Sequence, residues 1–262
     1  MLRAKPNIRC CFLSTTSNGL SFALSGCGWL TPFHFGAIDS LRSNGYINES
    51  TVVAGTSGGA IGALAAVCDV DPKISLEMLI KLSQNSKFRS NMDEGLYLAL
   101  MEMIPKDAVK RCNNRLIVTV TRVWPSPGTE PELISTYESN EDIIRAVVAS
   151  CFIPLYSSKT HLFSLYRQKH YLDGGVFSFF PPVGDITITP FPQSFINYIR
   201  LIRDNRNQPV DITPDLSTTF HYSIPRLLTW VLHPASPIIL RDLYKEGQQS
   251  TNIWIQSSKK TF

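Results

Sequence analysis

The stretch TVVAGTSGGA at residues 51–60 decides the fold, because it joins a short apolar strand to a helix through a glycine-rich turn. Thr51–Ala54 has strand character, and the small residues of 60–67 suit a helix packed closely on a sheet. Between them lies a G-x-S-x-G turn with Ser57 at its centre and Gly55, Gly58 and Gly59 around it. Glycine is needed beside such a serine because a side chain would collide with the strand and the helix. A plain turn can have this composition, but its place between strand and helix favours a nucleophilic serine.

The rest of the chain continues the alternation of strands and helices. Strands are predicted at 20–24, 116–124, 133–137 and 186–189, and helices at 32–41, 72–83, 95–104 and 143–150. This alternation predicts an α/β fold with a mostly parallel central sheet covered on both faces. We expect a leader or transit segment at 1–19, a catalytic domain at 20–191 and a helical C-terminal extension at 192–262.

A second glycine-rich loop, Gly26-Cys27-Gly28, lies between the first strand and its helix. Backbone N–H groups in such a loop can converge on one point and stabilise an oxyanion. The competing interpretation is a phosphate-binding loop. Thr31 stands where G-x-G-x-x-G requires glycine, and no P-loop lysine follows, so a nucleotide site is disfavoured.

Asp173-Gly174-Gly175 follows a strand-like segment and is either a plain turn or a rigidly held carboxylate. Acyl transfer requires a base for the serine proton, and an aspartate can serve only where burial raises its pKa. A Ser–Asp–His triad is the alternative, and the chain order leaves His221 or His233 as its histidine.

Composition excludes several classes of protein. The 262 residues are 44% hydrophobic and 18% charged with a net charge of +4, which is ordinary for a globular domain. No dense Lys/Arg run points to nucleic acid, and no apolar stretch reaches eighteen residues. The six cysteines form no CxxC pair and indicate free thiols in a reducing, intracellular compartment. The basic, acid-free N-terminus is typical of an organelle transit peptide or of a short leader.

Together the three glycine-rich elements resemble the patatin-like phospholipase family, and most closely its branch of adipose triglyceride lipase and adiponutrin. The resemblance rests on Ser25–Leu30, Ser57 in its pentapeptide, Ala149–Pro154 and Tyr171–Gly175, in the order of the family. It implies a three-layer α/β/α fold and a Ser57–Asp173 dyad without histidine. It further implies an oxyanion hole formed by Gly26, Cys27 and Gly28. Gly174 and Gly175 are expected to support the aspartate motif, and no metal or organic cofactor is expected.

By this resemblance the protein hydrolyses triacylglycerol or glycerophospholipid esters at a membrane or lipid-droplet surface, and a protein activator is compatible with it. We therefore expect the protein in the cytoplasm, associated peripherally with a membrane or lipid droplet. If the N-terminus is a transit peptide, we expect it in a mitochondrion or plastid instead. Two departures from the family pattern are Thr31, which could narrow the oxyanion loop, and the apolar run after Gly175, where Phe179 replaces a polar residue. We expect these phenylalanines either to weaken the aspartate site or to dock on lipid.

The alternative function is a catalytically weak or inactive lipid-surface regulatory protein, and a third is a histidine-dependent esterase. The aromatic residues of the C-terminal extension could bind lipid or simply pack in the core; they are Phe191, Phe195, Tyr198, Trp230 and Trp254.

Overall fold

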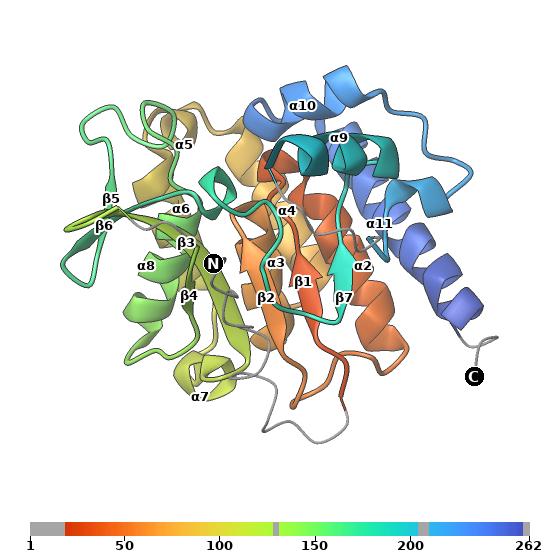
Figure 1. The fold of residues 1–262 in the computed structure, drawn as a ribbon, viewed down its shortest axis with the longest axis horizontal. Coiled ribbons are helices and arrows are strands. Elements are labelled where there is room, and N and C mark those ends of the chain that lie inside the picture. Colours follow the sequence, from red (N-terminus) through yellow and green to blue (C-terminus); the bar gives the residue numbers. More distant parts are fainter. Residues whose placement is uncertain (1–18, 128–130, 204–209, 259–262) are drawn as a thin grey trace, which may run out of the picture.

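A computed structural model describes residues 19–127, 131–203 and 210–258. Its centre is a sheet of seven strands, β1 (Phe22–Leu24), β2 (Val53–Thr56), β3 (Leu116–Trp124), β4 (Glu132–Ile134), β5 (Ser164–Tyr166), β6 (Lys169–Leu172) and β7 (Ile186–Ile188). The order is β5-β6-β3-β2-β1-β7, with β4 paired to β3. Strands β3, β2, β1 and β7 are parallel, whereas β4 and β6 pair antiparallel to β3. The sheet is therefore mixed at one side and parallel at its centre, as Figure 1 shows.

Helices surround this sheet and complete the expected α/β/α arrangement. They are α2 (Thr31–Ser43), α3 (Gly58–Val67), α4 (Pro72–Gln84), α5 (Ser86–Ser90), α6 (Met92–Met103), α7 (Ala108–Cys112), α8 (Asn140–Ser150), α9 (Gln193–Arg203), α10 (Ile224–Leu232) and α11 (Pro237–Ser258). Short 3-10 turns occur at Gly28–Leu30 (η1), Gly174–Val176 (η2) and Pro214–Leu216 (η3). None of the helices among the described residues combines the length and the apolar character needed to cross a bilayer.

Strand register brings three distant segments to one end of the sheet. Leu24 pairs with Gly55, so the loop after β1 and the turn after β2 lie side by side. Thr56 pairs with Thr119 of β3, and Leu172 of the antiparallel β6 pairs with Thr121. Because β6 runs antiparallel to β3, the chain that leaves it at Asp173 continues alongside β3 towards Thr119, which pairs with the end of β2. Parallel sheets commonly place their sites at this carboxyl edge.

The C-terminal helix α11 packs along α2, and the two lie side by side in Figure 1. Two glycines permit this close approach. A Cβ on Gly36 would lie 1.9 Å from the Tyr244 carbonyl oxygen, and one on Gly247 would lie 2.0 Å from that of Phe33. Tyr244 also donates to Asp39 at 2.7 Å. Residues of α11 thus belong to the same hydrophobic core as α2.

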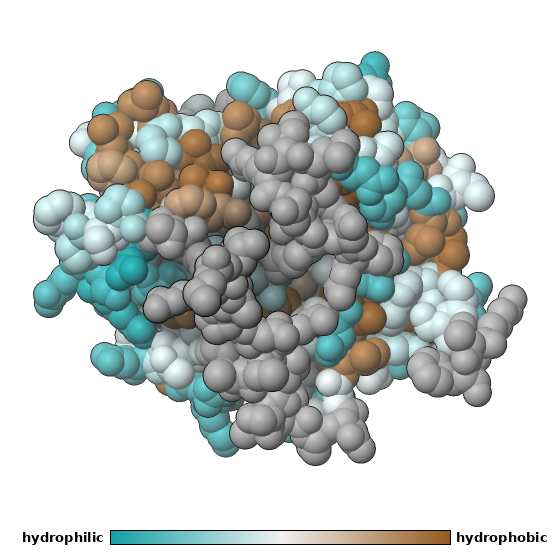
Figure 2. All heavy atoms as spheres, viewed as in Figure 1, coloured by the Kyte–Doolittle hydropathy of each residue, from teal (hydrophilic) through white to brown (hydrophobic). Residues whose placement is uncertain are grey.

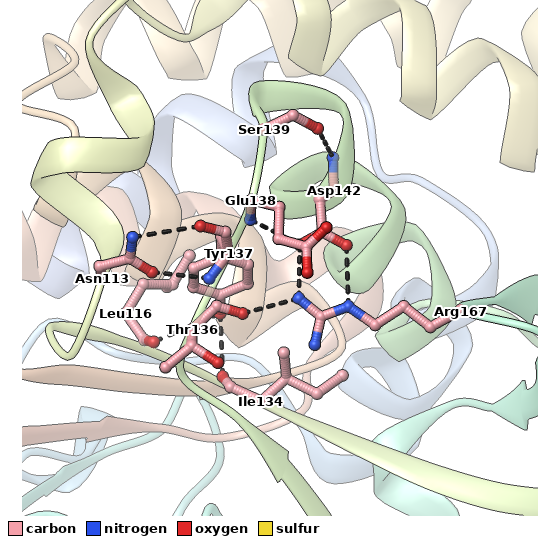
Figure 3. A network of polar contacts seen from close by, with 9 residues as sticks. All are labelled: Asn113, Leu116, Ile134, Thr136, Tyr137, Glu138, Ser139, Asp142 and Arg167. Carbon is pink, nitrogen blue, oxygen red and sulfur yellow. Dashed lines mark hydrogen bonds and ion pairs between the residues drawn. The ribbon is translucent and has the colours of Figure 1, made fainter.

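The hairpin β5–β6 was not predicted, and Arg167 in its turn ties it to the N-terminus of α8 (Figure 3). Arg167 Nε donates to Asp142 at 3.0 Å, and its Nη2 donates to the Thr136 carbonyl at 2.8 Å. Ser139 caps α8 as expected, by accepting from the Asp142 amide at 3.0 Å. The predicted strand at 133–137 is shorter, because Tyr137 leaves the sheet for reciprocal hydrogen bonds with the Asn113 side chain.

Most aromatic residues of the C-terminal extension pack against the body. Phe191 is buried, Phe195 lies 4.9 Å from it between ring centroids, and Trp254 packs edge-on against Tyr46. Trp230 packs likewise on Tyr222. Only Tyr198 among the five is largely exposed. Residues 1–18, which carry the leader or transit prediction with Cys10 and Cys11, lie outside the described residues.

Candidate active site

Ser57 occupies the sharp turn between β2 and α3. Its backbone has φ 52° and ψ −125°, a conformation that is costly for any residue with a side chain. The Ala60 amide donates to the Ser57 carbonyl at 2.7 Å and so closes the first turn of α3. The strain is held in place by the strand before it and the helix after it, which is the expected geometry of a nucleophile turn.

The three glycines around Ser57 have no room for a side chain. A Cβ on Gly55 would lie 2.3 Å from the Gly59 carbonyl oxygen. One on Gly58 would lie 2.6 Å from Thr31 Oγ1, and one on Gly59 would lie 2.4 Å from the Leu24 carbonyl oxygen. Each contact is far shorter than real Cβ contacts allow, so these positions require glycine for close packing of α3 on the sheet.

Asp173 lies directly against Ser57. The Ser57 hydroxyl donates to Asp173 Oδ2 at 2.6 Å, and the Gly175 amide donates to the other carboxylate oxygen at 2.7 Å. The Asp173 amide donates to the Phe152 carbonyl at 2.8 Å. Both side chains are buried, with 9% exposure for Ser57 and 7% for Asp173. Two hydrogen bonds therefore fix the carboxylate and a third fixes the Asp173 backbone, with one carboxylate oxygen aimed at the serine.

Burial raises the pKa of Asp173 from its ordinary value of 3.8 to about 6, although the hydrogen bonds from Ser57 and Gly175 work in the opposite direction. At neutral pH the carboxylate is ionised, yet it binds a proton far more readily than an exposed aspartate. A pKa close to the working pH is what general acid–base catalysis requires.

Gly174 and Gly175 form the η2 turn that aims the carboxylate. A Cβ on Gly174 would lie 2.2 Å from the Thr119 carbonyl oxygen, so the turn rests directly on β3. A Cβ on Gly175 would lie 3.0 Å from Asp173 Oδ1, close to the atom that the Gly175 amide binds. Glycine at both positions thus lets the turn approach the sheet and the carboxylate.

The loop after β1 lies beside Ser57, but only part of it is available to an oxyanion. The Gly26 amide donates to the Phe179 carbonyl at 2.8 Å, so one of the three residues expected to form the oxyanion hole has its amide already paired. Among the described residues, the amides of Cys27 and Gly28 donate to no backbone carbonyl. Gly28 has φ +52°, and a Cβ there would lie 2.0 Å from the Val231 carbonyl oxygen. Helix α10 thus covers this loop.

Thr31 and Phe179, the two departures from the family pattern, both hold this loop in place. The Thr31 hydroxyl donates to the Gly28 carbonyl at 2.7 Å and also lies 3.3 Å from that of Gly58. It therefore fixes the underside of the loop to the first turn of α3. The Phe179 ring packs on Phe180 and Phe191 rather than projecting into solvent, and the exposed phenylalanine of this run is Phe177.

The thiols at the site are neutral. Burial raises the pKa of Cys27 to about 12, against the hydrogen bond with Thr31, and burial raises the pKa of Cys151 well above its usual range. Cys27, Cys68, Cys112 and Cys151 are all free thiols, as predicted. An uncharged, buried thiol is a poor nucleophile, which leaves Ser57 as the nucleophile candidate.

No histidine completes a triad among the described residues. His221 contacts the Thr219 carbonyl and the Tyr222 ring, and neither His221 nor His233 contacts Ser57 or Asp173. His34 is buried with Nε2 3.0 Å from the Ser25 carbonyl oxygen, and burial lowers its pKa to about 4, so it stays neutral. Its role is to support the loop after β1.

Sequence reasoning missed two features of the site. Ser150, at the end of α8, accepts a hydrogen bond from the Ser57 amide at 2.8 Å. Its hydroxyl is ordinary in sequence, and only its place in the Ala149–Pro154 motif could have drawn attention to it. The cover formed by α10 was also missed, because the contact of Val231 with Gly28 joins residues far apart in the chain.

Comparison with known proteins finds matches in both sequence and fold. The family model for patatin-like phospholipases matches residues 22–183, more than half of the chain. The chain is 29% identical over 253 residues to omega-hydroxyceramide transacylase of Mus musculus, with 87% of this chain and 39% of that protein covered. It is 28% identical over 258 residues to patatin-like phospholipase domain-containing protein 2 of Mus musculus, with 90% and 49% covered.

A third relative is 1-acylglycerol-3-phosphate O-acyltransferase Pnpla3 of Mus musculus, 27% identical over 253 residues with 87% of this chain and 56% of that protein covered. The chain thus spans about half the length of these relatives. Among solved structures, VipD from Legionella pneumophila has the same fold, with a TM-score of 0.52, 12% identity and coverage of 92% of this chain and 67% of that chain. These relatives confirm the predicted adiponutrin branch, and the chain belongs to the patatin-like phospholipase family.

Proposed function

We propose that this protein is a lipid acyl hydrolase in which Ser57 and Asp173 act as a catalytic dyad. The observation that carries the proposal is the 2.6 Å hydrogen bond from the strained, buried serine to a carboxylate whose pKa burial has raised to about 6. Membership of the patatin-like phospholipase family supports a lipid ester as the substrate.

In the first half of the reaction, Asp173 Oδ2 accepts the hydroxyl proton as Ser57 Oγ attacks the ester carbonyl. The negative charge on the tetrahedral intermediate falls on the former carbonyl oxygen. We assign its stabilisation to the free amides of Cys27 and Gly28, helped by the N-terminus of α3. As the bond between the carbonyl carbon and the alkoxide oxygen breaks, Asp173 returns the proton to that oxygen, and the alcohol departs. The acyl group remains as an ester on Ser57 Oγ.

In the second half, a water molecule attacks the acyl ester while Asp173 takes its proton, and the fatty acid departs as Ser57 Oγ regains a proton. No metal or organic cofactor has a part in these steps. The dyad is sufficient because one carboxylate serves as base and acid in turn.

A lipid surface is the proposed setting for this reaction. Large apolar side chains are exposed on segments that contact the site, namely Leu155, Val176, Phe177, Leu228 and Leu232. Val176 and Phe177 follow the Asp173 turn, and Leu228 and Leu232 belong to α10 above Gly28. Figure 2 shows apolar atoms gathered at the upper left, where α5 lies in Figure 1. Peripheral association with a membrane or lipid droplet follows from this surface.

Acyl transfer to a lipid hydroxyl is a second candidate reaction. Two of the relatives are named as a transacylase and an acyltransferase. A nearly buried serine limits access of water to the acyl ester, so a lipid alcohol could replace water in the second half. The first half of the reaction is unchanged.

The test is fatty-acid release from triacylglycerol emulsions and from phosphatidylcholine vesicles, with and without added monoacylglycerol as acceptor. Release that is lost in Ser57→Ala and in Asp173→Asn, but kept in His221→Asn and His233→Asn, supports the dyad. Chromatography of the products separates free fatty acid from a new diacylglycerol. A folded wild type that releases and transfers nothing would overturn the enzyme proposal in favour of a non-catalytic lipid-surface protein.

A further inference from the structure

The end of α8 meets both members of the proposed dyad. Ser150 binds the Ser57 amide, and Phe152 two residues later binds the Asp173 amide through its carbonyl. Cys151 between them lies against the Ser57 side chain. Three consecutive residues of one segment thus contact the nucleophile and its base, although more than ninety residues separate that segment from Ser57.

Ser150 itself is fully buried and uses its hydroxyl twice. Ser150 Oγ accepts from the Ser57 amide at 2.8 Å and donates to the Thr119 carbonyl at 2.7 Å. The Ser57 amide follows the last residue of β2 and donates to no backbone carbonyl of the described residues. Without the Ser150 oxygen this amide would be a buried donor with no partner, which is unfavourable.

The same Thr119 carbonyl also supports the turn that carries Asp173. Gly174 rests on it so closely that a Cβ there would lie only 2.2 Å from the oxygen. Thr119 pairs with Thr56 in the sheet, directly before the nucleophile. Ser150 therefore connects the backbone of the nucleophile to the point on β3 against which the aspartate turn is placed.

The segment after Ser150 is held rigidly enough to transmit this position. The Ser157 hydroxyl donates to the Cys151 carbonyl at 3.2 Å and accepts from the Ile153 amide at 2.9 Å. Phe152 stacks on His161 with ring centroids 5.3 Å apart. The carbonyl that receives the Asp173 amide is thereby fixed relative to Ser150.

We propose that Ser150 is a positioning residue that sets the orientation of the Ser57 nucleophile relative to Asp173. The inference rests on the proposed function, because it assumes that Ser57 is the attacking group. Ser150 does not touch the substrate. It keeps the Ser57 peptide at the angle from which Oγ reaches both Asp173 Oδ2 and an ester carbonyl, and small misplacements of a reacting group can reduce a rate by about a hundredfold.

Removing the hydroxyl should lower turnover much more than binding. For Ser150→Ala we expect kcat to fall about 10- to 100-fold, as is typical when a group that orients a reacting residue is lost. KM should change less than about twofold, because no substrate contact is removed. The acidic limb of the pH profile should stay where Asp173 puts it, since its own hydrogen bonds remain.

The experiment compares Ser150→Ala with Ser150→Cys, Ser150→Thr and Ser75→Ala. The cysteine variant keeps the volume but replaces oxygen with a weak acceptor, and the threonine variant keeps the hydroxyl. Ser75 is a fully buried serine in α4 whose hydroxyl donates to the Asp71 carbonyl at 3.1 Å, so it controls for loss of an ordinary buried hydrogen bond. Each variant is measured for kcat, KM, thermal unfolding and the second-order rate of labelling by a fluorophosphonate.

The expected result is slow turnover and slow labelling in the alanine and cysteine variants, near wild-type rates in Ser75→Ala and substantial recovery in Ser150→Thr. Equal rates in Ser150→Ala and Ser75→Ala would overturn the positioning role, and so would equal losses in Ser150→Ala and Ser150→Thr. A wild type that does not label at Ser57 would instead refute the proposed function. The two failures are therefore distinguishable.

Discussion

Asp173→Asn should make the protein more stable while it removes activity. Burial raises the pKa of Asp173 to about 6, which means that the ionised form is less favourable in the folded than in the unfolded chain. Asparagine fits the same place: its oxygen can accept from the Gly175 amide and its NH2 can donate to Ser57 Oγ. The variant therefore keeps the contacts of the site and loses the buried charge.

The size of the expected gain in stability follows from the pKa shift of Asp173. A rise from 3.8 to about 6 corresponds to about 3 kcal/mol of lost stability above pH 6, at roughly 1.4 kcal/mol per pKa unit. Because the folded pKa is raised, the wild type has its full stability below the unfolded pKa and loses it as pH rises through the folded pKa. The advantage of the asparagine variant should thus be absent near pH 4, grow towards pH 6 and remain constant above it.

Urea denaturation of the wild type and of Asp173→Asn at pH 4.5, 6 and 8 measures this difference in the free energy of unfolding. Asp142→Asn provides the matched control with the opposite sign. Burial disfavours ionisation of Asp142, but the hydrogen bonds from Arg167 and the Glu138 amide outweigh it and lower its pKa. That variant should be less stable than wild type at pH 8, with the loss shrinking as pH falls. An Asp173→Asn protein that is less stable at pH 8, or whose gain does not vary with pH, would refute the reasoning.

Three further predictions concern the same structure. Ester hydrolysis should fall about tenfold per pH unit below a midpoint near 6, because only ionised Asp173 accepts the Ser57 proton; a rate that is flat down to pH 5 in a pH–rate profile would contradict this assignment. Gly28→Ala should reduce fatty-acid release by at least about 100-fold with the protein still folded, since the added Cβ meets Val231 at 2.0 Å and the oxyanion loop must move; wild-type release would exclude that loop from the site. Gly247→Ala should lower the free energy of unfolding by roughly 1–3 kcal/mol in urea titrations, because its Cβ would lie 2.0 Å from a backbone oxygen of α2. Gly19→Ala, where nothing lies within 4 Å, is its control, and equal stability of the two variants would mean that α11 does not depend on this close approach.

Local sequence patterns were sufficient to predict the glycine-rich turns of the site and the strands and helices beside them. The strand–turn–helix order around Ser57, the glycine loop after the first strand and the Asp173 turn each follow from nearby residues, because strain and close packing at such turns require glycine. That they come together was implied by the resemblance to the patatin-like family, and in the structure the Ser57–Asp173 hydrogen bond joins two of the three. The catalytic roles themselves stay predictions.

Contacts between distant segments were not predictable in this way. The Gly26 amide is taken by the Phe179 carbonyl, a backbone interaction that leaves no mark on side-chain identity. The short hairpin β5–β6 lacks a long alternating pattern and depends on Arg167 reaching Asp142. Ser150 is one hydroxyl among many in the sequence, and its importance arises only from its place beneath Ser57.

The most direct test of the central claim is to locate the covalent adduct that forms when the protein reacts with a long-chain fluorophosphonate. Peptide mass spectrometry should find one phosphonate on Ser57, formed with a rate that falls below a pH near 6 and is strongly reduced in Asp173→Asn. An adduct on another residue, or a labelling rate that is unchanged in Asp173→Asn, would contradict the dyad.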